Sequence, residues 1–265
     1  MCGQFIDPLA VLENEKRTRD HLPPAAFFPK SLRKQGVFQN LDTLPTHYGC
    51  NNTHKEDEEY VARAMALFVG DQTSMGNALL QEFVNQLKKE PGKASVTGGI
   101  MDSVSEKHPS GISVPPSKLV VQVDALKLQN VMWKIARGIF FKHFDSVLPE
   151  DKDFYIQYYP PPDVQLPEQV EKFLGLSPTV RTSNPKVFIY KYGLFNQQGI
   201  IAHLMFFFFW DCFIVYILFH AFECKCEDCL SNDAVKVARG KLISVIKMIS
   251  NKNKTCKMGP TFQER

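Results

Sequence analysis

The chain has 265 residues, a length that suits one large domain or two small ones. Hydrophobic residues make up 44% of it, enough for a buried core, whereas the formal net charge is only +3. This charge excludes binding to nucleic acid through an overall basic field, so any such contact must come from local patches. Residues 1–20 lack the basic start and apolar run of a signal peptide, so we expect a cytoplasmic protein with reduced cysteines.

The most informative stretch lies between Asp20 and Asn51, where short polar motifs recur at three places. These motifs are Asp20-His21, Asn40 and Cys50-Asn51. Hydrolysis of a phosphodiester bond needs a general base that deprotonates water and a divalent cation that stabilises negative charge. His21 is a candidate base because the ordinary pKa of histidine lies near neutrality. The carboxylate of Asp20 and the amide oxygen of Asn51 are hard ligands that suit a magnesium-like ion.

The order of these motifs resembles that of the HNH endonucleases, and the resemblance covers residues 2–70. It implies a ββα-metal fold with the acid and the histidine on the first strand and the last asparagine on the helix. By this resemblance His21 is the general base, and Asp20 and Asn51 hold a catalytic Mg²⁺ or Mn²⁺. Asn40 would keep the loop and the imidazole aligned. The resemblance therefore implies a metal-dependent endonuclease that acts on DNA, with His21, Asn40 and Asn51 as catalytic residues.

The resemblance also implies a structural zinc site. Many HNH proteins bind zinc through two Cys-x-x-Cys pairs. Here the second pair reads His47-x-x-Cys50, and the first is reduced to Cys2. Histidine and cysteine are both ordinary zinc ligands, so these three residues are the candidates. The alternative is a polar loop at His47 and a buried free thiol at Cys50.

Basic side chains flank the polar motifs, where they would suit contact with a phosphate backbone. The alternative is an ordinary solvated charged surface. These side chains are Arg17, Arg19, Lys30, Arg33 and Lys34. No phosphate-binding glycine loop occurs, so we expect no nucleotide cofactor.

Residues 56–90 follow a helical apolar spacing, and acidic residues at the start of the segment suit the first turn of a helix. Gly70-Asp71 predicts a break into two helices, and Pro91-Gly92 ends the second. Glycine, proline and serine then predict a loop or linker over residues 91–117.

The rest of the middle region alternates short β-branched runs with helical patterns. We expect strands at 119–123, 154–159 and 187–192, and helices at 124–144 and 165–176. Asp124 is predicted to cap the first of these helices, because aspartate accepts hydrogen bonds from the free amides of a first turn.

Residues 199–222 form a long apolar run that is long enough to span a bilayer. However, Asp211 lies near its middle, where an unpaired carboxylate is costly in a membrane, and Phe, Ile and Val favour strands. We therefore predict two buried antiparallel strands that meet around Trp210-Asp211, in a sheet covered by the helix at 124–144. The alternative is a membrane helix that tethers the chain.

The C-terminal segment carries a cysteine cluster and a basic, amphipathic stretch. Cys224, Cys226 and Cys229, with Cys256 as a fourth ligand, suit a thiophilic metal; the alternative is reduced thiols. Residues 234–249 predict an amphipathic surface helix, and the alternative is a basic helix that binds nucleic acid or a membrane surface. Residues 250–265 have the composition of a disordered tail.

Together these patterns predict an α+β protein in three parts. An HNH-like ββα-metal module occupies residues 1–70, a mixed domain of helices and antiparallel strands residues 71–222, and a cysteine-containing basic tail residues 223–265. The predicted function is that of an HNH-type DNA endonuclease. Two alternatives remain open: a non-catalytic, zinc-containing module that binds nucleic acid or protein, and a membrane-tethered protein.

Overall fold

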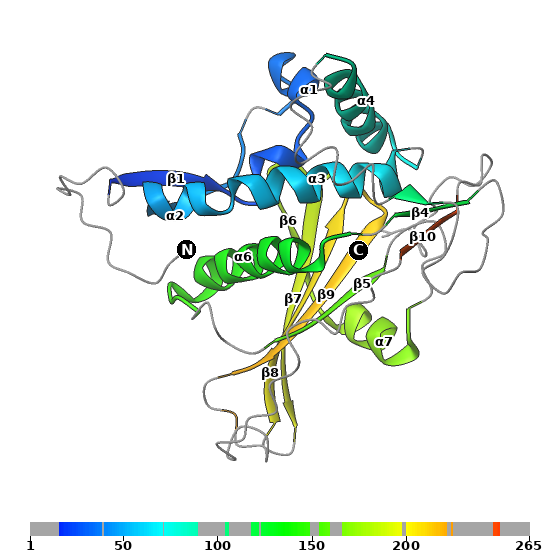
Figure 1. The fold of residues 1–265 in the computed structure, drawn as a ribbon. Coiled ribbons are helices and arrows are strands. Elements are labelled where there is room, and N and C mark those ends of the chain that lie inside the picture. Colours follow the sequence, from blue (N-terminus) through cyan, green and yellow to red (C-terminus); the bar gives the residue numbers. More distant parts are fainter. Residues whose placement is uncertain are drawn as a thin grey trace.

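The computed structural model has a mixed α+β fold of helices and antiparallel sheets (Figure 1), which confirms the predicted class. It describes residues 16–38, 40–70, 72–89, 104–105, 118–121, 123–148, 154–159, 166–197, 200–221, 224 and 246–249. Within these ranges the strands form a two-stranded, a three-stranded and a five-stranded sheet.

The N-terminal unit is a two-stranded hairpin followed by a helix. Strand β1 (Arg17–His21) pairs antiparallel with β2 (Thr43–His47), and α2 (Tyr48–Thr53) starts at the next residue. The connection between the strands holds η2 (Ala25–Phe27) and α1 (Lys30–Lys34). Since His21 lies opposite Thr43 and His47 opposite Arg17, the Asp20-His21 pair and His47 occupy opposite ends of the hairpin.

Two helices follow, as predicted: α3 (Lys55–Val69) and α4 (Ser74–Lys89). The break at Gly70 has a steric cause. A Cβ atom at this position would lie 2.8 Å from the carbonyl oxygen of Ala66 and 2.9 Å from Cβ of Leu80, which is too close for any side chain. Glycine therefore lets the two helices approach each other at the turn.

The long helix α6 (Ala125–Phe144) begins where the sequence predicts, because the side chain of Asp124 accepts hydrogen bonds from the amides of Leu126 and Lys127 at 3.1 and 3.2 Å. Before it lies β4 (Lys118–Val121), as expected, between β3 (Val104–Ser105) and β10 (Ile246–Ile249).

Strand β10 corrects the helix predicted over residues 234–249. Its four residues form a strand in which Ile246 lies opposite Val121 and Met248 opposite Leu119. Isoleucine and valine are residue types that favour strands, so this segment pairs with β4 instead of forming a surface helix. The remaining residues of the predicted helix lie outside the described part of the chain, as do the other residues of the predicted loop at 91–117 apart from β3.

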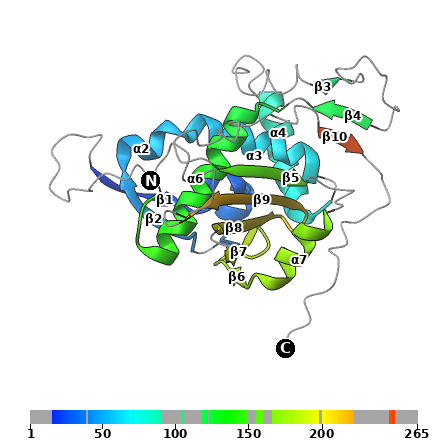
Figure 2. The ribbon, with the colours of Figure 1, turned by 90° about the horizontal axis from the view of Figure 1, so that it is seen from below.

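The five-stranded sheet has the order β5-β9-β8-β7-β6, and Figure 2 shows the strands following one another in this order. Its members are β5 (Tyr155–Tyr159), β6 (Thr179–Arg181), β7 (Phe188–Gln197), β8 (Ile200–Phe209) and β9 (Phe213–His220), and α7 (Glu168–Leu176) lies between β5 and β6 in the chain. The strand pair predicted within 199–222 is therefore confirmed, and a membrane helix in this segment is wrong. Among the described residues, no helix combines the length and apolarity that crossing a bilayer requires.

The phenylalanine run of β8 is buried on both faces of the sheet. Phe207 and Phe209 belong to the cluster that includes α3 and α6, whereas Phe206 and Phe208 pack with α7. Successive strand residues point to opposite faces, so an unbroken apolar run is what a doubly covered strand requires. The predicted cover by α6 is confirmed by the ring of Trp133, 5.4 Å from that of Phe219 on β9.

The turn between β8 and β9 joins the sheet to the N-terminal unit. Trp210 and Asp211 have φ of 51° and 60°, a left-handed conformation that costs energy in residues other than glycine. The indole Nε1 of Trp210 donates a hydrogen bond to the carbonyl oxygen of Phe27 at 3.2 Å. The Phe27 ring also packs edge-on against Phe209, with centroids 5.2 Å apart, so both units share one core.

Candidate functional site

Asp20 takes part in a buried ion cluster formed by three elements. Asp20 lies on β1, Glu58 on α3 and Lys134 on α6. Nζ of Lys134 lies 2.7 Å from Oδ2 of Asp20 and also donates a hydrogen bond to Oε1 of Glu58. The three side chains are only 7–12% exposed. Because burial disfavours a charged carboxylate, the pKa of Glu58 is raised, although the neighbouring Lys134 partly opposes this. We call these three residues the ion cluster.

His21 lines a small pocket beside the ion cluster. Other residues around it include Asp20, Lys134, Ile135 and Gly138, and the space amounts to about 10 Å³, the least that a single water molecule needs. Nδ1 of His21 is buried and, among the described residues, has no hydrogen-bond partner. Burial lowers the pKa of His21, as do the charges of Arg33 and Lys134, whereas Asp20 raises it. The imidazole is therefore mainly neutral at pH 7, the form a general base needs.

Asn51 lies close to the hairpin but has a different neighbour. Its Nδ2 donates a hydrogen bond to the carbonyl oxygen of Arg19, at 3.2 Å. This contact ties α2 to β1 one residue before Asp20. Asn51 does not line the His21 pocket. The structure therefore brings the last motif to the backbone of β1, through Asn51, and not to the pocket that Asp20 and His21 line.

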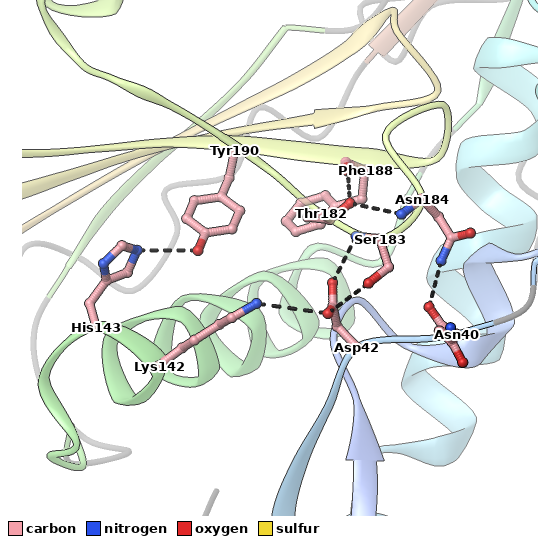
Figure 3. Close-up of polar contacts among 9 residues, drawn as sticks. All are labelled: Asn40, Asp42, Lys142, His143, Thr182, Ser183, Asn184, Phe188 and Tyr190. Carbon is pink, nitrogen blue, oxygen red and sulfur yellow. Dashed lines mark hydrogen bonds and ion pairs between the residues drawn. The ribbon is translucent and has the colours of Figure 1, made fainter.

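Asn40 contacts the large sheet rather than the pocket. Its backbone carbonyl accepts a hydrogen bond of 3.1 Å from Nδ2 of Asn184, in the turn before β7 (Figure 3). Nearby, the carboxylate of Asp42 accepts from the hydroxyl and amide of Ser183 and lies 3.8 Å from Nζ of Lys142. The contacts of this loop dock the hairpin onto the sheet, and alignment of the imidazole by Asn40 stays a prediction.

His47 and Cys50 lie side by side at the other end of the hairpin. Nδ1 of His47 and Sγ of Cys50 are 4.0 Å apart. Two ligands of one tetrahedral zinc ion, at usual bond lengths, stand about 3.5 Å apart, so this spacing is near that of a zinc pair. Cys2 lies outside the described residues. Within the described ranges, no group of three or more His, Cys, Asp or Glu residues is placed to hold a metal ion.

Of the C-terminal cysteines, Cys224 is described, whereas Cys226, Cys229 and Cys256 lie outside the described residues. Cys224 is buried, with its Sγ 3.6 Å from Nδ1 of His220 and 3.5 Å from the amide of Ile201. These contacts hold the chain after β9 against the start of β8. Metal binding by the cysteine cluster stays a prediction.

The basic residues near the hairpin differ in exposure. Arg17 and Arg19 are exposed and, being two residues apart on β1, project from one face of the hairpin. Lys30 and Lys34 on α1 are exposed, and Arg33 is half-buried. Charged side chains within reach of solvent are what contact with a phosphate backbone needs.

Sequence reasoning missed Glu58 and Lys134. Glu58 belongs to the acidic first turn of α3, and the favourable interaction of negative charge with a helix N-terminus is enough to account for an acid at this position. The signal for Lys134 was its place among the buried apolar residues of α6, because a lysine is rarely buried without a partner of opposite charge. The identity of that partner depends on how α3, α6 and β1 pack.

No protein-family model matches the chain, and no curated protein or solved structure matches it either.

Proposed function

We propose that the N-terminal unit is the catalytic centre of an HNH-type endonuclease that hydrolyses DNA phosphodiester bonds with Mg²⁺ or Mn²⁺. The observation that carries the proposal is the His21 pocket: a largely neutral imidazole, with a buried Nδ1 that has no partner among the described residues, lines a small pocket together with Asp20. In this proposal the imidazole of His21 takes a proton from a water molecule as the water attacks phosphorus.

The oxygen atoms near Asp20 are of the type that a divalent ion prefers. Two carboxylates, from Asp20 and Glu58, converge on one positive charge, which in the structure is the ammonium of Lys134. Carboxylate oxygens are the ligands that Mg²⁺ and Mn²⁺ prefer. In the proposal, Asp20 and the amide oxygen of Asn51 hold the ion. When bound, it would stabilise the negative charge that develops on the phosphate and on the leaving oxygen.

The exposed Arg17 and Arg19 support DNA as the partner, because they offer positive charge on the strand that carries His21. Their role in the proposal is to bind phosphates and fix the position of the duplex. His47 and Cys50, with Cys2, would hold a structural zinc ion that fastens β2 to α2. Asn40 keeps the loop between the strands in place.

The test is nicking of supercoiled plasmid in the presence of Mg²⁺ or Mn²⁺. His21→Ala should lower the nicking rate by at least about a hundredfold, the usual contribution of a general base. His143→Ala is a matched control, because His143 is also partly buried and its pKa is also lowered. It lies away from the pocket, at the end of α6, where its Nε2 is hydrogen-bonded to the hydroxyl of Tyr190. Nicking by the control at the rate of the unchanged protein, with a rate at least about a hundredfold lower for His21→Ala, supports the proposal. A rate for His21→Ala equal to that of the unchanged protein removes His21 from the mechanism.

A second candidate function is binding of nucleic acid or protein without cleavage. The specific observation that favours it is the ion pair of Asp20 with Lys134, which neutralises the carboxylate that the metal would need. A shift of DNA mobility in a gel without cleavage, in buffers with either metal, would favour this candidate. Loss of that shift in an Arg17→Ala, Arg19→Ala double variant would assign the contact to β1.

A further inference from the structure

One face of α6 lines a second cavity, which has a volume of about 150 Å³. Leu126 and Asn130, near the start of the helix, are exposed, whereas Trp133, Arg137 and Phe154 are buried. The cavity therefore opens to solvent beside the first turns of α6 and closes around the aromatic rings and the guanidinium.

The wall of this cavity includes a buried acceptor. Gln129 is 5% exposed, and its Oε1 has no hydrogen-bond partner among the described residues. An unpaired buried oxygen is costly, so a ligand whose N–H group reaches it would be favoured. At the closed end, Nε of Arg137 donates a hydrogen bond to the carbonyl oxygen of Leu148 at 2.9 Å. This contact holds the guanidinium, a planar fork of N–H donors that carries positive charge.

The spacing of these groups suits a flat ring system. Gln129 and Arg137 are eight positions apart on α6, which is about 12 Å along the axis at about 1.5 Å per residue. Trp133 lies midway, and its ring stacks on that of Phe154, with centroids 4.2 Å apart and planes 8° from parallel. Nucleobases stack on aromatic side chains of this kind. Since a cavity of about 150 Å³ holds one benzene ring, a two-ring base would fill it and extend into the mouth.

We infer that this cavity binds a guanine base. Guanine has N–H donors, at N1 and the 2-amino group, on one side and two adjacent acceptors, O6 and N7, on the other. Oε1 of Gln129 accepts from the donors, and the guanidinium of Arg137 donates to O6 and N7, the commonest specific contact to guanine. Adenine has no two adjacent acceptors, so it cannot receive both hydrogen bonds of the fork. The inference concerns binding alone and does not rest on the proposed cleavage.

The experiment measures binding of guanosine 5′-monophosphate (GMP) to the full chain by isothermal titration calorimetry, with EDTA present. The unchanged protein should bind GMP at least about fivefold more tightly than adenosine 5′-monophosphate (AMP), which carries the same sugar and phosphate. Gln129→Met keeps the size of the side chain but removes the acceptor, so its affinity for GMP should fall by at least about fivefold. Gln72→Met is the matched control, because Gln72 is also buried but does not line the cavity, and its affinity should not change. Circular dichroism establishes that each variant is folded.

No binding of GMP, equal affinities for GMP and AMP, or full GMP affinity in folded Gln129→Met would overturn the inference. Should Gln129→Met not fold, inosine 5′-monophosphate decides, because it lacks the 2-amino donor. It should bind the unchanged protein at least about threefold more weakly than GMP, and equal affinities would overturn the inference.

Competition identifies the source of the base. Displacement of GMP by a dT strand with one central guanine, but not by an all-dT strand, assigns the cavity to a base of single-stranded DNA. GMP binding that neither strand disturbs assigns it to a free nucleotide, and equal displacement by both strands contradicts the reading of guanine. Nicking is measured separately, so the nuclease and the guanine site can fail independently.

Discussion

Lys134 brings together three distant parts of the chain. Its backbone belongs to α6, while its ammonium contacts an acid from β1 and an acid from α3. A buried ion pair contributes little net stability compared with apolar packing, but removal of one partner leaves an isolated charge and is strongly destabilising. The ion cluster therefore fixes where the hairpin sits on the helices, and with it the position of His21.

Glu58→Gln tests the charge state of the ion cluster through the pH dependence of stability. Burial raises the pKa of Glu58 in the folded state, so the folded protein binds its proton more tightly than the unfolded chain does. The unchanged protein should therefore gain stability relative to Glu58→Gln as the pH falls through the raised folded pKa toward 4.5. Urea unfolding of both proteins between pH 7 and pH 4.5 measures this. A stability difference that does not change with pH would mean that the pKa of Glu58 is not raised.

Part of the site was predictable at the level of single residues. Asp20 and His21 are adjacent residues on β1, so the sequence alone places them close together. Asn51 lies in the helix directly after β2, and because β2 pairs with β1, Asn51 comes close to β1. Glu58 and Lys134 are 76 positions apart, and their meeting depends on tertiary packing that no local pattern encodes.

Helix α1 has only five residues, too few to be stable without outside contacts. The carboxylate of Glu82 on α4 supplies them by accepting hydrogen bonds from the amides of Lys30 and Ser31, at 2.8 and 2.5 Å, and from the Ser31 hydroxyl. Although burial alone would raise the pKa of Glu82, these hydrogen bonds outweigh it and lower the pKa. Glu82 thus acts for α1 as an N-cap from another helix.

Glu82→Ala should lower stability by about 1 kcal/mol at pH 7, the usual loss for a removed cap. Since the folded pKa of Glu82 is lowered, this stabilisation is present above its unfolded value of 4.5 and disappears as the pH falls through the folded value. Urea unfolding at pH 7 and pH 3 measures it, with Gln81→Ala, an exposed neighbour, as control. A loss of equal size at both pH values would contradict the role of the charge.

The strands could be predicted where the pattern of apolar residues fits a strand and no other element. The Phe run of β8 suits a strand covered on both faces, and the turn at Trp210-Asp211 divides it from β9. Residues 246–249 were misread because four residues of mixed apolar and basic character fit either a helix face or a short strand. Their partner β4 lies more than 120 positions away, so pairing could not be inferred locally.

At the scale of the whole molecule, the hairpin and the large sheet share one hydrophobic core. Leu22, Phe27 and Phe28 belong to the same buried cluster as Phe209 and Trp210. Polar contacts of Asp42 and Asn184 add to this junction. We therefore expect the two units to unfold together, although the sequence predicts a boundary near residue 70.

Trp210→Phe should lower stability by about 2 kcal/mol, because it removes the hydrogen bond to the Phe27 carbonyl and leaves a small void. Unfolding should remain a single transition, since the contact joins both units. The measurement is urea unfolding followed by circular dichroism and by the fluorescence of the remaining tryptophan, Trp133. Separate midpoints for the two signals would show that the units unfold independently.

The most direct measurement is the initial rate of plasmid nicking at saturating Mn²⁺ for the unchanged protein and for folded His21→Ala. Loss of a general base usually costs 10²–10⁴-fold in rate, so the rate for His21→Ala should fall by at least about a hundredfold. EDTA should stop the unchanged protein. Equal rates for the two proteins, or no nicking by the unchanged protein in Mn²⁺ or Mg²⁺, would contradict the proposed role of this hairpin.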